Sequence, residues 1–387
     1  MKRIRIIPLI TIIFIMISCN KRSTYPCEAD YSSVDTIFYD YKHENIISRD
    51  SVFGKISFVS LETNEDNLIG AVDQVIFGDS TIIIVDRKIA KAVFMFDYDG
   101  KYIGRISNLG NGRNEYLDLT YVSKRKDKSI ALFDQFSGIV VVYDERGNYI
   151  ETIKSDLYAN AMEFITDELM AFDIYDRYPK SYDPYGDVSF AVRNKNQETK
   201  YLFGLTHFKQ GFNYTRYYNL YSYDDVVYCN VNFEDYIYEL TSDTVKAKYR
   251  IIYGPENVNN YPYKNKEELY SLQDNYPFFE GEFVELSDYT YLMYRGLNGN
   301  EMFYNHNTKQ TVAISSGFNN PLLAFFRRPI ARYGENTLVC ALSVTEILQC
   351  RKMLLNGSIQ NAEVNELYQE LELDSNPTLF FFEVSFL

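Results

Sequence analysis

TIIIVDRKIAKAVFMFDYDGKYIGRI, residues 81–106, is the stretch that decides the fold of this chain. It contains two apolar runs of strand-forming residues, 81–86 and 92–97, and a turn at 98–101 that leads into a third run at 102–106. Asp, Asn and Gly tolerate the backbone angles of tight turns, so strand-forming runs bounded by these residues are typical of antiparallel hairpins. The segment predicts a meander of antiparallel strands.

The first run of this segment recurs along the chain. The copies are TIIIVD (81–86), SIALFD (129–134), ELMAFD (168–173), DVVYCN (225–230), TYLMYR (290–295) and TLVCAL (337–342). Each of the first five copies is followed by a second apolar run and a turn. Their spacing is irregular, but it suits one four-stranded blade with loop insertions per copy.

The sixth copy is followed by a different pattern. Residues 343–357 and 365–373 have apolar residues at helical spacing, and only then does TLFFFEVSF (378–386) provide another strand. The last blade therefore lacks an outer strand, and Ser57–Leu61 can supply it, which would remove the two open edges of the ring. We predict an all-β fold, a six-bladed β-propeller with an N-terminal strand closing the last blade and a helical insertion in that blade. An irregular β-sandwich, or two β domains, is the alternative.

The first 20 residues have the pattern of a bacterial export signal. A basic segment, 2–5, precedes an apolar stretch, 6–17, that is too short to cross about 30 Å of hydrocarbon as a helix. It ends in Met16-Ile17-Ser18-Cys19, which resembles a lipobox, where the cysteine is acylated and becomes the first mature residue. The alternative is an ordinary secretory signal with a chance cysteine.

The lipobox sets the expected organisation of the chain. We expect a signal peptide at 1–18, a lipid on Cys19, a polar tether at 19–50 and the propeller at 51–387. Residues 20–22, Asn-Lys-Arg, are not the acidic residues that tend to follow the cysteine in surface-exported lipoproteins of the Bacteroides group. We therefore expect a lipid anchor in the outer membrane, with the protein facing the periplasm.

Composition excludes several classes of function. The chain has 39 Lys and Arg against 53 Asp and Glu, a formal net charge of −14, which argues against nucleic-acid binding. Three His and five Cys offer little material for a zinc site. Cys27, Cys229, Cys340 and Cys350 have no diagnostic spacing, so no disulfide is predicted; Cys229 and Cys340 lie in apolar runs, where a free buried thiol is common.

These features together resemble the six-bladed β-propeller lipoproteins of the Bacteroides group, a mostly uncharacterised family distantly similar to NHL-repeat propellers. The matching segments are the lipobox, the hairpin FDYDGKYIGRI (96–106), the loop after it, DYIYEL (235–240) and the late helix leading to Asn376-Pro377. In the family that loop commonly reads Gly-x-Gly-Pro-Gly-Glu-Tyr, whereas here Arg113 and Asn114 replace the Pro and the following Gly. The resemblance implies fold and location and no settled activity.

Ligand-binding candidates come from two places. In the loop 110–116, we expect Arg113, Glu115 and Tyr116 to face the channel mouth; a purely structural crossover between blades is the alternative. The innermost strand of each blade lines the channel and lies just upstream of each repeated run. Those segments contain Arg216, Tyr217, Glu280, Glu282, Arg327, Arg328 and Arg332. The three Arg could hold an anionic group, or they could pair with the surplus acids.

Other acidic residues are expected to be structural. Asp86, Asp134 and Asp173 end corresponding runs, where they can accept hydrogen bonds from nearby backbone. Asp97–Gly100 resembles the start of a calcium loop but lacks the later Glu, so a hairpin turn is predicted there.

Two hypotheses of function follow. The first is a lipid-anchored binding or scaffold protein of the cell envelope without catalysis, cofactor or metal. It would bind an unknown solute, peptide or envelope protein at the channel mouth or loop face. The second is a metal-dependent enzyme, lactonase- or lyase-like, acting on a small carbohydrate-derived substrate, because other six-bladed propellers hold a divalent metal in the channel. Glu115, Asp118, Asn160 and Glu282 would be its ligands.

Overall fold

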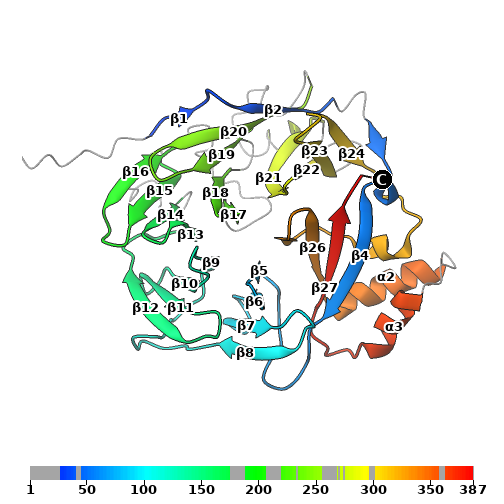
Figure 1. Cartoon of the computed structure of the whole chain (residues 1–387), viewed down its shortest axis with the longest axis horizontal. Coiled ribbons are helices and arrows are strands. Elements are labelled where there is room, and N and C mark those ends of the chain that lie inside the picture. The colour runs from blue at the N-terminus through cyan, green and yellow to red at the C-terminus, as the bar shows by residue number, and fades with distance from the viewer. Residues whose placement is uncertain are drawn as a thin grey trace, which may run out of the picture.

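A computed structural model describes residues 27–40, 45–174, 188–205, 219–231, 234–254, 268, 271–272, 275–295, 301–356 and 362–386. The signal segment and Cys19, and the candidates Arg216 and Tyr217, lie outside these residues, as does the side chain of Glu280. Six antiparallel sheets stand around a central shaft, and the predicted six-bladed propeller is confirmed (Figure 1). The described helices are too short or too polar to cross a membrane.

Each blade is built from four consecutive positions, innermost strand first. The first two blades are β5 (Gln74–Phe77), β6 (Ile82–Asp86), β7 (Ala92–Phe96), β8 (Tyr102–Ile106) and β9 (Tyr121–Lys124), β10 (Ile130–Asp134), β11 (Ile139–Tyr143), β12 (Tyr149–Lys154). The next two are β13 (Ala161–Thr166), β14 (Leu169–Asp173), β15 (Phe190–Asn194), β16 (Thr199–Phe203) and β17 (Leu220–Tyr223), β18 (Val226–Cys229), β19 (Tyr236–Leu240), β20 (Val245–Ile252). The last two are β21 (Phe278–Glu285), β22 (Tyr289–Arg295), β23 (Glu301–Asn305), β24 (Thr311–Ile314) and β25 (Ala331–Tyr333), β26 (Thr337–Leu342), β27 (Thr378–Val384), β4 (Phe53–Ser60).

Burial explains why the repeated runs are apolar without alternation. All six are the second strands of their blades, and every residue of β6, β7 and β10 is buried. A middle strand of a blade is covered on both faces by the neighbouring blades, so both sets of side chains are apolar. The outer strand β20 alternates between buried and partly or fully exposed residues, because only one of its faces packs on the core.

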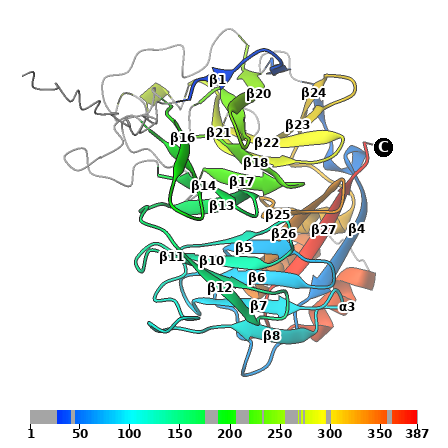
Figure 2. The same cartoon turned by 60° about the vertical axis from the view of Figure 1, so that its left-hand side comes forward.

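The sixth blade combines the two ends of the propeller. Strand β4 lies antiparallel to β27, with Leu379 opposite Val59 and Phe381 opposite Ser57, and forms the outermost position of the blade. Helices α2 (Val344–Asn356) and α3 (Ala362–Glu370) come between β26 and β27 and pack beside this blade, outside the ring (Figures 1 and 2). Apolar residues of α2 such as Ile347 join the same core cluster as Leu338 and Phe380.

The segment before β4 lies along the rim of the ring. A tether is predicted for 19–50, but β1 (Ala29–Asp30) and β2 (Asp35–Phe38) pair in parallel with β20, and β3 (Ile46–Ile47) pairs with β24 (Figure 1). Ile37 is fully buried and Tyr39 nearly so. The described part of the segment therefore differs from a tether, because it covers the open edges of two outer strands.

Recurrent aspartates hold the loops between blades. Asp86 accepts hydrogen bonds from the amides of Gly70, Ala71 and Ile89, and Asp134 accepts four backbone hydrogen bonds in the equivalent place. Asp173 accepts a bond from the amide of Asn219. All three side chains are fully buried. The structural role predicted for these residues is confirmed.

Candidate functional site

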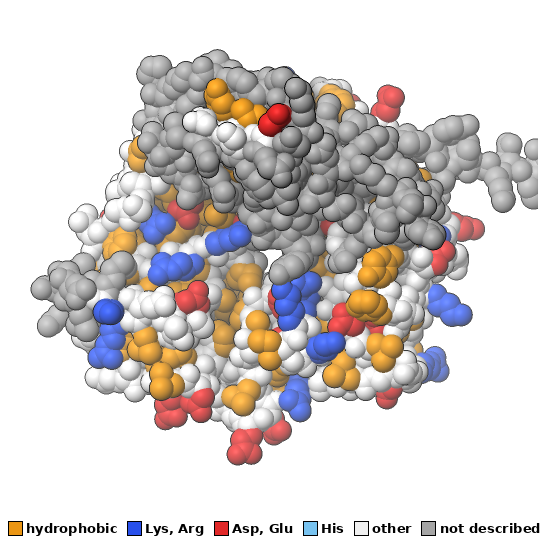
Figure 3. Space-filling view, turned by 180° about the vertical axis from the view of Figure 1, so that it is seen from behind, with side chains coloured by type: hydrophobic (Ala, Val, Ile, Leu, Met, Phe, Trp, Pro, Cys, Tyr) orange, Lys and Arg blue, Asp and Glu red, His pale blue; other side chains and the backbone are white. Residues whose placement is uncertain are grey.

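The central channel contains a cavity of about 900 Å³. Five of the six innermost strands, β5, β9, β13, β17 and β25, contribute to its wall. We call the end at which these strands begin the N-mouth, near Asp73 and Arg328, and the opposite end the C-mouth, near Asp224 and Glu335. From behind, Lys and Arg side chains lie around the middle of the face, among apolar ones (Figure 3).

Polar side chains of the innermost strands join neighbouring blades around this channel. The amide of Gln74 exchanges two hydrogen bonds with the backbone of Val122, which joins blades 1 and 2. The hydroxyls of Tyr221 and Tyr223 on β17 donate to carbonyls of β21, each at 2.9 Å. Their rings therefore remain in the channel wall with their hydroxyl groups already satisfied.

Glu163, on β13, is the most deeply buried acid in the cavity wall. Its side chain accepts hydrogen bonds from Tyr121 Oη at 2.8 Å and Ser123 Oγ at 2.5 Å, both from β9 of the neighbouring blade. Burial raises the pKa of Glu163 from 4.5 to about 7, and the two hydroxyl donors oppose this rise only partly. The carboxyl group is thus poised between its neutral and charged forms near neutral pH.

The arginines at the channel have acidic partners. Arg87 lies 3.4 Å from Asp73, and Arg328 forms an ion pair with Glu282, which is 2% exposed. Each pair joins one cation of the wall to one anion. The prediction that Glu282 and Arg328 meet at the channel is therefore correct in position, while the charge of Arg328 is balanced by a protein carboxylate.

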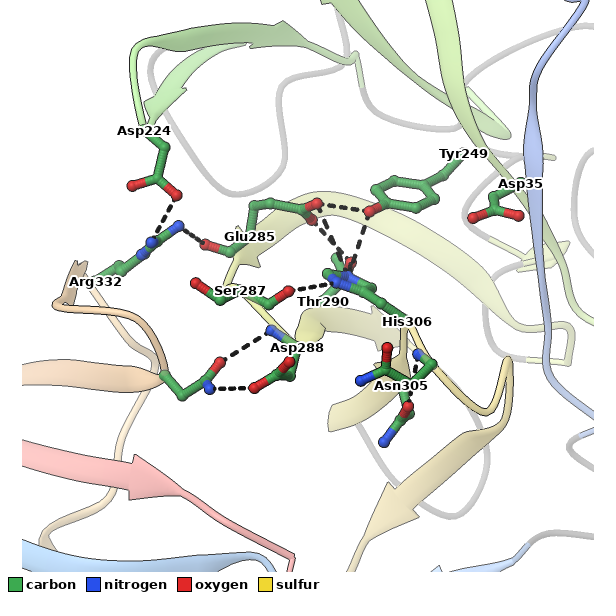
Figure 4. A network of polar contacts seen from close by, with 12 residues as sticks. Asp35, Asp224, Tyr249, Glu285, Ser287, Asp288, Thr290, Asn305, His306 and Arg332 are labelled. Atoms are coloured by element: carbon green, nitrogen blue, oxygen red, sulfur yellow. Dashed lines mark hydrogen bonds and ion pairs between the residues drawn. The ribbon is translucent and has the colours of Figure 1, made fainter.

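Arg332 connects three blades at the C-mouth (Figure 4). From β25 its guanidinium lies 2.7 Å from Asp224 Oδ2 in blade 4 and donates to the carbonyl of Glu285 in blade 5 at 3.0 Å. It also donates to the carbonyl of Gly334. These three acceptors fix the side chain in one orientation.

Glu285 continues this network away from the channel (Figure 4). Its carboxylate accepts hydrogen bonds from Tyr249 at 2.6 Å and Thr290 at 2.8 Å. His306 Nε2 lies 2.8 Å from Thr290 Oγ1, and Nδ1 lies 3.0 Å from the carbonyl of Ser287, so Nδ1 must carry the hydrogen. Burial, together with the nearby Glu285, raises the pKa of Tyr249. The network joins blades 4 and 5 and has no open position for a substrate, so we interpret it as structural.

The loop 110–116 does not supply the channel contacts predicted for it. Glu115 accepts a hydrogen bond from the amide of Gly112 at 2.6 Å, and a Cβ on Gly110 or Gly112 would collide with its carboxyl group. Tyr116 is fully buried and donates to the carbonyl of Lys91, and burial raises its pKa. The two glycines are therefore needed to hold the Glu115 carboxyl inside its own loop.

Arg113 also lies away from the cavity. Its Nε donates to Tyr149 Oη at 3.2 Å, on the outer strand of blade 2, and its guanidinium lies over that ring. Arg113, Glu115 and Tyr116 are thus corrected from channel residues to residues that fasten the crossover between blades.

Arg327 differs from its neighbour Arg328. Its guanidinium donates to the carbonyls of Ala324 and Phe326, at the end of the short helix η3 (Pro321–Phe325), and to Cys350 Sγ in α2. The predicted cluster of three arginines is therefore divided, with Arg327 fastening the helical insertion and Arg328 and Arg332 at the channel.

The residues of the metal-enzyme hypothesis are not brought together. Asp118 pairs with Lys91 at 2.8 Å, Glu115 is held by its loop, and neither these two nor Asn160 lines the cavity. Within the described ranges, no group of three or more His, Cys, Asp or Glu side chains is placed to hold a metal. Cys27, Cys229, Cys340 and Cys350 are free thiols.

The sequence prediction passed over part of the wall. Gln74, Lys124 and Glu163 lie just upstream of the first three repeated runs, in the position that the prediction itself assigns to the channel. The signal was therefore present in the first three blades, whereas only segments of the last three were searched.

The fold and the channel define the class of the molecule, a six-bladed β-propeller with a central cavity lined by charged and aromatic side chains. Residues 33–383 match the family described as Domain of unknown function (DUF4934), and the chain belongs to this family. The propeller part of the predicted resemblance is confirmed, while the lipid anchor and the NHL-repeat likeness stay predictions.

Two solved structures from Bacteroides are similar to the chain. One is a protein of Bacteroides fragilis NCTC 9343, described provisionally as exported, with a TM-score of 0.71, 16% identity, and coverage of 91% of this chain and 100% of that one. The other is a member of the DUF4221 family from Bacteroides vulgatus, with a TM-score of 0.49, 12% identity, and coverage of 86% and 97%. The first similarity supports the fold. No curated protein matches the sequence.

Proposed function

We propose that this protein is an exported, lipid-anchored propeller of the bacterial cell envelope that binds a small polar solute in its central channel without transforming it. The cavity of about 900 Å³ carries this proposal, because concave sites with aromatic walls and a few placed polar groups are where proteins hold small ligands. The described channel residues form inter-blade hydrogen bonds and ion pairs rather than a nucleophile with an adjacent base.

Location is proposed from the N-terminal sequence. The basic segment, the apolar stretch and Ser18-Cys19 favour acylation at Cys19. A protein of the same fold is described provisionally as exported. An outer-membrane anchor facing the periplasm would place the channel among envelope solutes. Labelling growing cells with an alkyne fatty acid tests the anchor: the label should appear on the full chain and disappear in Cys19→Ala.

A channel-filling substitution tests the binding site. Ser222 on β17 is exposed and lines the cavity, so Ser222→Trp should occupy the channel, whereas Ser57→Trp places the same side chain on the exposed face of β4 as a control. The full chain would be incubated with a small-molecule extract of the cell envelope, washed, and its retained compounds identified by mass spectrometry. Wild type and Ser57→Trp should retain a compound that Ser222→Trp does not. Equal retention by all three would overturn the proposal.

A further inference from the structure

The charges of the channel wall favour a cationic ligand over an anionic one. The wall contains four cations, Arg87, Lys124, Arg328 and Arg332, and five acids, Asp73, Glu163, Asp224, Asp225 and Glu335. Three of the cations form ion pairs, with Asp73, Glu282 and Asp224. The fourth, Lys124, donates to the carbonyl of Phe77 at 2.8 Å. An anionic ligand would have to compete with protein carboxylates for each arginine.

Glu163 is different from the other acids of the wall. Within the described part of the chain, no Lys or Arg forms an ion pair with it, and its partners are the hydroxyls of Tyr121 and Ser123. A carboxylate has about four acceptor positions, so these two hydroxyls leave about two positions for another donor. The remaining exposed part of the side chain faces the cavity.

The rings around Glu163 suit a cation with an apolar body. Tyr121, Tyr221, Tyr223 and Phe77 all line the same cavity. Aromatic faces attract ammonium and guanidinium groups and pack on apolar atoms. Because the hydroxyls of these tyrosines are already hydrogen bonded, the rings offer faces and edges rather than new donors.

We propose that the channel recognises a small organic amine or guanidine, whose cationic group is seated against Glu163 and whose body lies between the aromatic rings of the wall. This inference rests on the proposed function and names the class of solute. The step is a binding equilibrium, and no bond is made or broken.

Other titratable groups do not replace Glu163 in this role. Strands packed against β13 carry Tyr121 and Lys124 on β9, Asp173 on β14, Tyr221 and Tyr223 on β17, and Tyr228 and Cys229 on β18. Of these, Tyr121 is the one that hydrogen bonds to Glu163. Binding of a cation should therefore follow the ionisation of Glu163, and should weaken as the carboxyl group takes up its proton in acid.

The test uses three probes with one body, 4-phenylbutylamine, 4-phenylbutanol and 4-phenylbutyrate. Their affinities for the full chain carrying Cys19→Ser would be measured by titration calorimetry at about pH 6 and pH 8. At the higher pH the amine should bind at least about tenfold more tightly than the alcohol, since a hydrogen bond to a buried charge is worth that much. Its affinity should fall about tenfold at the lower pH, since a carboxyl group of pKa about 7 is mostly protonated there.

Two matched variants separate recognition by Glu163 from general attraction. Glu163→Gln should abolish both the preference for the amine and its pH dependence, with alcohol binding kept as the check of folding. Glu335→Gln, an exposed acid at the C-mouth of the same channel, should change amine affinity less than about twofold. An equal loss in both variants would overturn the role of Glu163.

The outcomes also distinguish this inference from the proposed function. Tighter binding of the butyrate would overturn the amine proposal and leave a solute-binding channel. The same holds if no probe binds while the envelope extract still yields a compound whose retention Ser222→Trp abolishes. If no probe binds and no compound is retained, both proposals fail.

Discussion

Glu163→Gln should make the protein more stable at alkaline pH and leave its stability almost unchanged in acid. The side chain is fully buried, and burial raises its pKa from 4.5 to about 7. The folded protein therefore keeps a proton that the unfolded chain releases above about pH 4.5. Stability falls by about 1.4 kcal/mol for each pH unit between these two pKa values and stays constant above the higher one. The total loss is roughly 3 kcal/mol, and glutamine, which has no proton to lose, removes it.

The assay is urea unfolding of wild type and variant at pH values from about 4.5 to 8. The difference in free energy of unfolding should grow from near zero to roughly 3 kcal/mol in favour of the variant. Glu234, whose pKa burial and the adjacent Asp235 also raise to about 7, is present in both proteins and cancels from the difference. Glu335→Gln, at an exposed carboxyl group, provides the control and should give a difference that hardly changes with pH. A pH-independent difference for Glu163→Gln would refute the reasoning, because it would mean that the carboxyl group titrates as it does in water.

Three further predictions concern the fold. Asn376→Ala should cost roughly 2 kcal/mol in urea unfolding, since its side chain bonds three backbone groups of the segment that follows β4; a cost near zero would contradict its role in closing the ring. Asp134→Ala should cost about 3 kcal/mol because four backbone amides lose a buried acceptor, and an unchanged unfolding midpoint would speak against it. In the native protein a thiol reagent should modify the partly exposed Cys27 well before Cys229 and Cys340, whose pKa values burial raises; equal rates, read by mass spectrometry, would show that the middle strands open readily.

The repeated runs made the fold predictable because a middle strand of a blade has no face left for polar side chains. TIIIVD and its copies differ in sequence, yet every one becomes a second strand. The aspartates at the ends of these runs were equally informative, since a buried carboxylate at a strand end needs backbone donors and the loops provide them.

The site was less predictable because a side chain in a loop can turn either way. Glu115 had the right residue type and a loop that could reach the channel, but Gly110 and Gly112 leave space for its carboxyl group inside the loop. Arg327 and Arg328 are neighbours in sequence and point to different parts of the fold, as adjacent residues of an extended segment must. Position in an innermost strand was the reliable indicator, and Glu163 has it.

A crystal structure of the full chain carrying Cys19→Ser, grown near pH 8 with 4-phenylbutylamine, tests the central claim most directly. The account predicts the ligand in the central channel, with its nitrogen within hydrogen-bonding distance of the Glu163 carboxylate and its phenyl group among the tyrosines of the wall. An amine bound at another surface, or seated in the channel against Asp225 or Glu335 with Glu163 untouched, would contradict it.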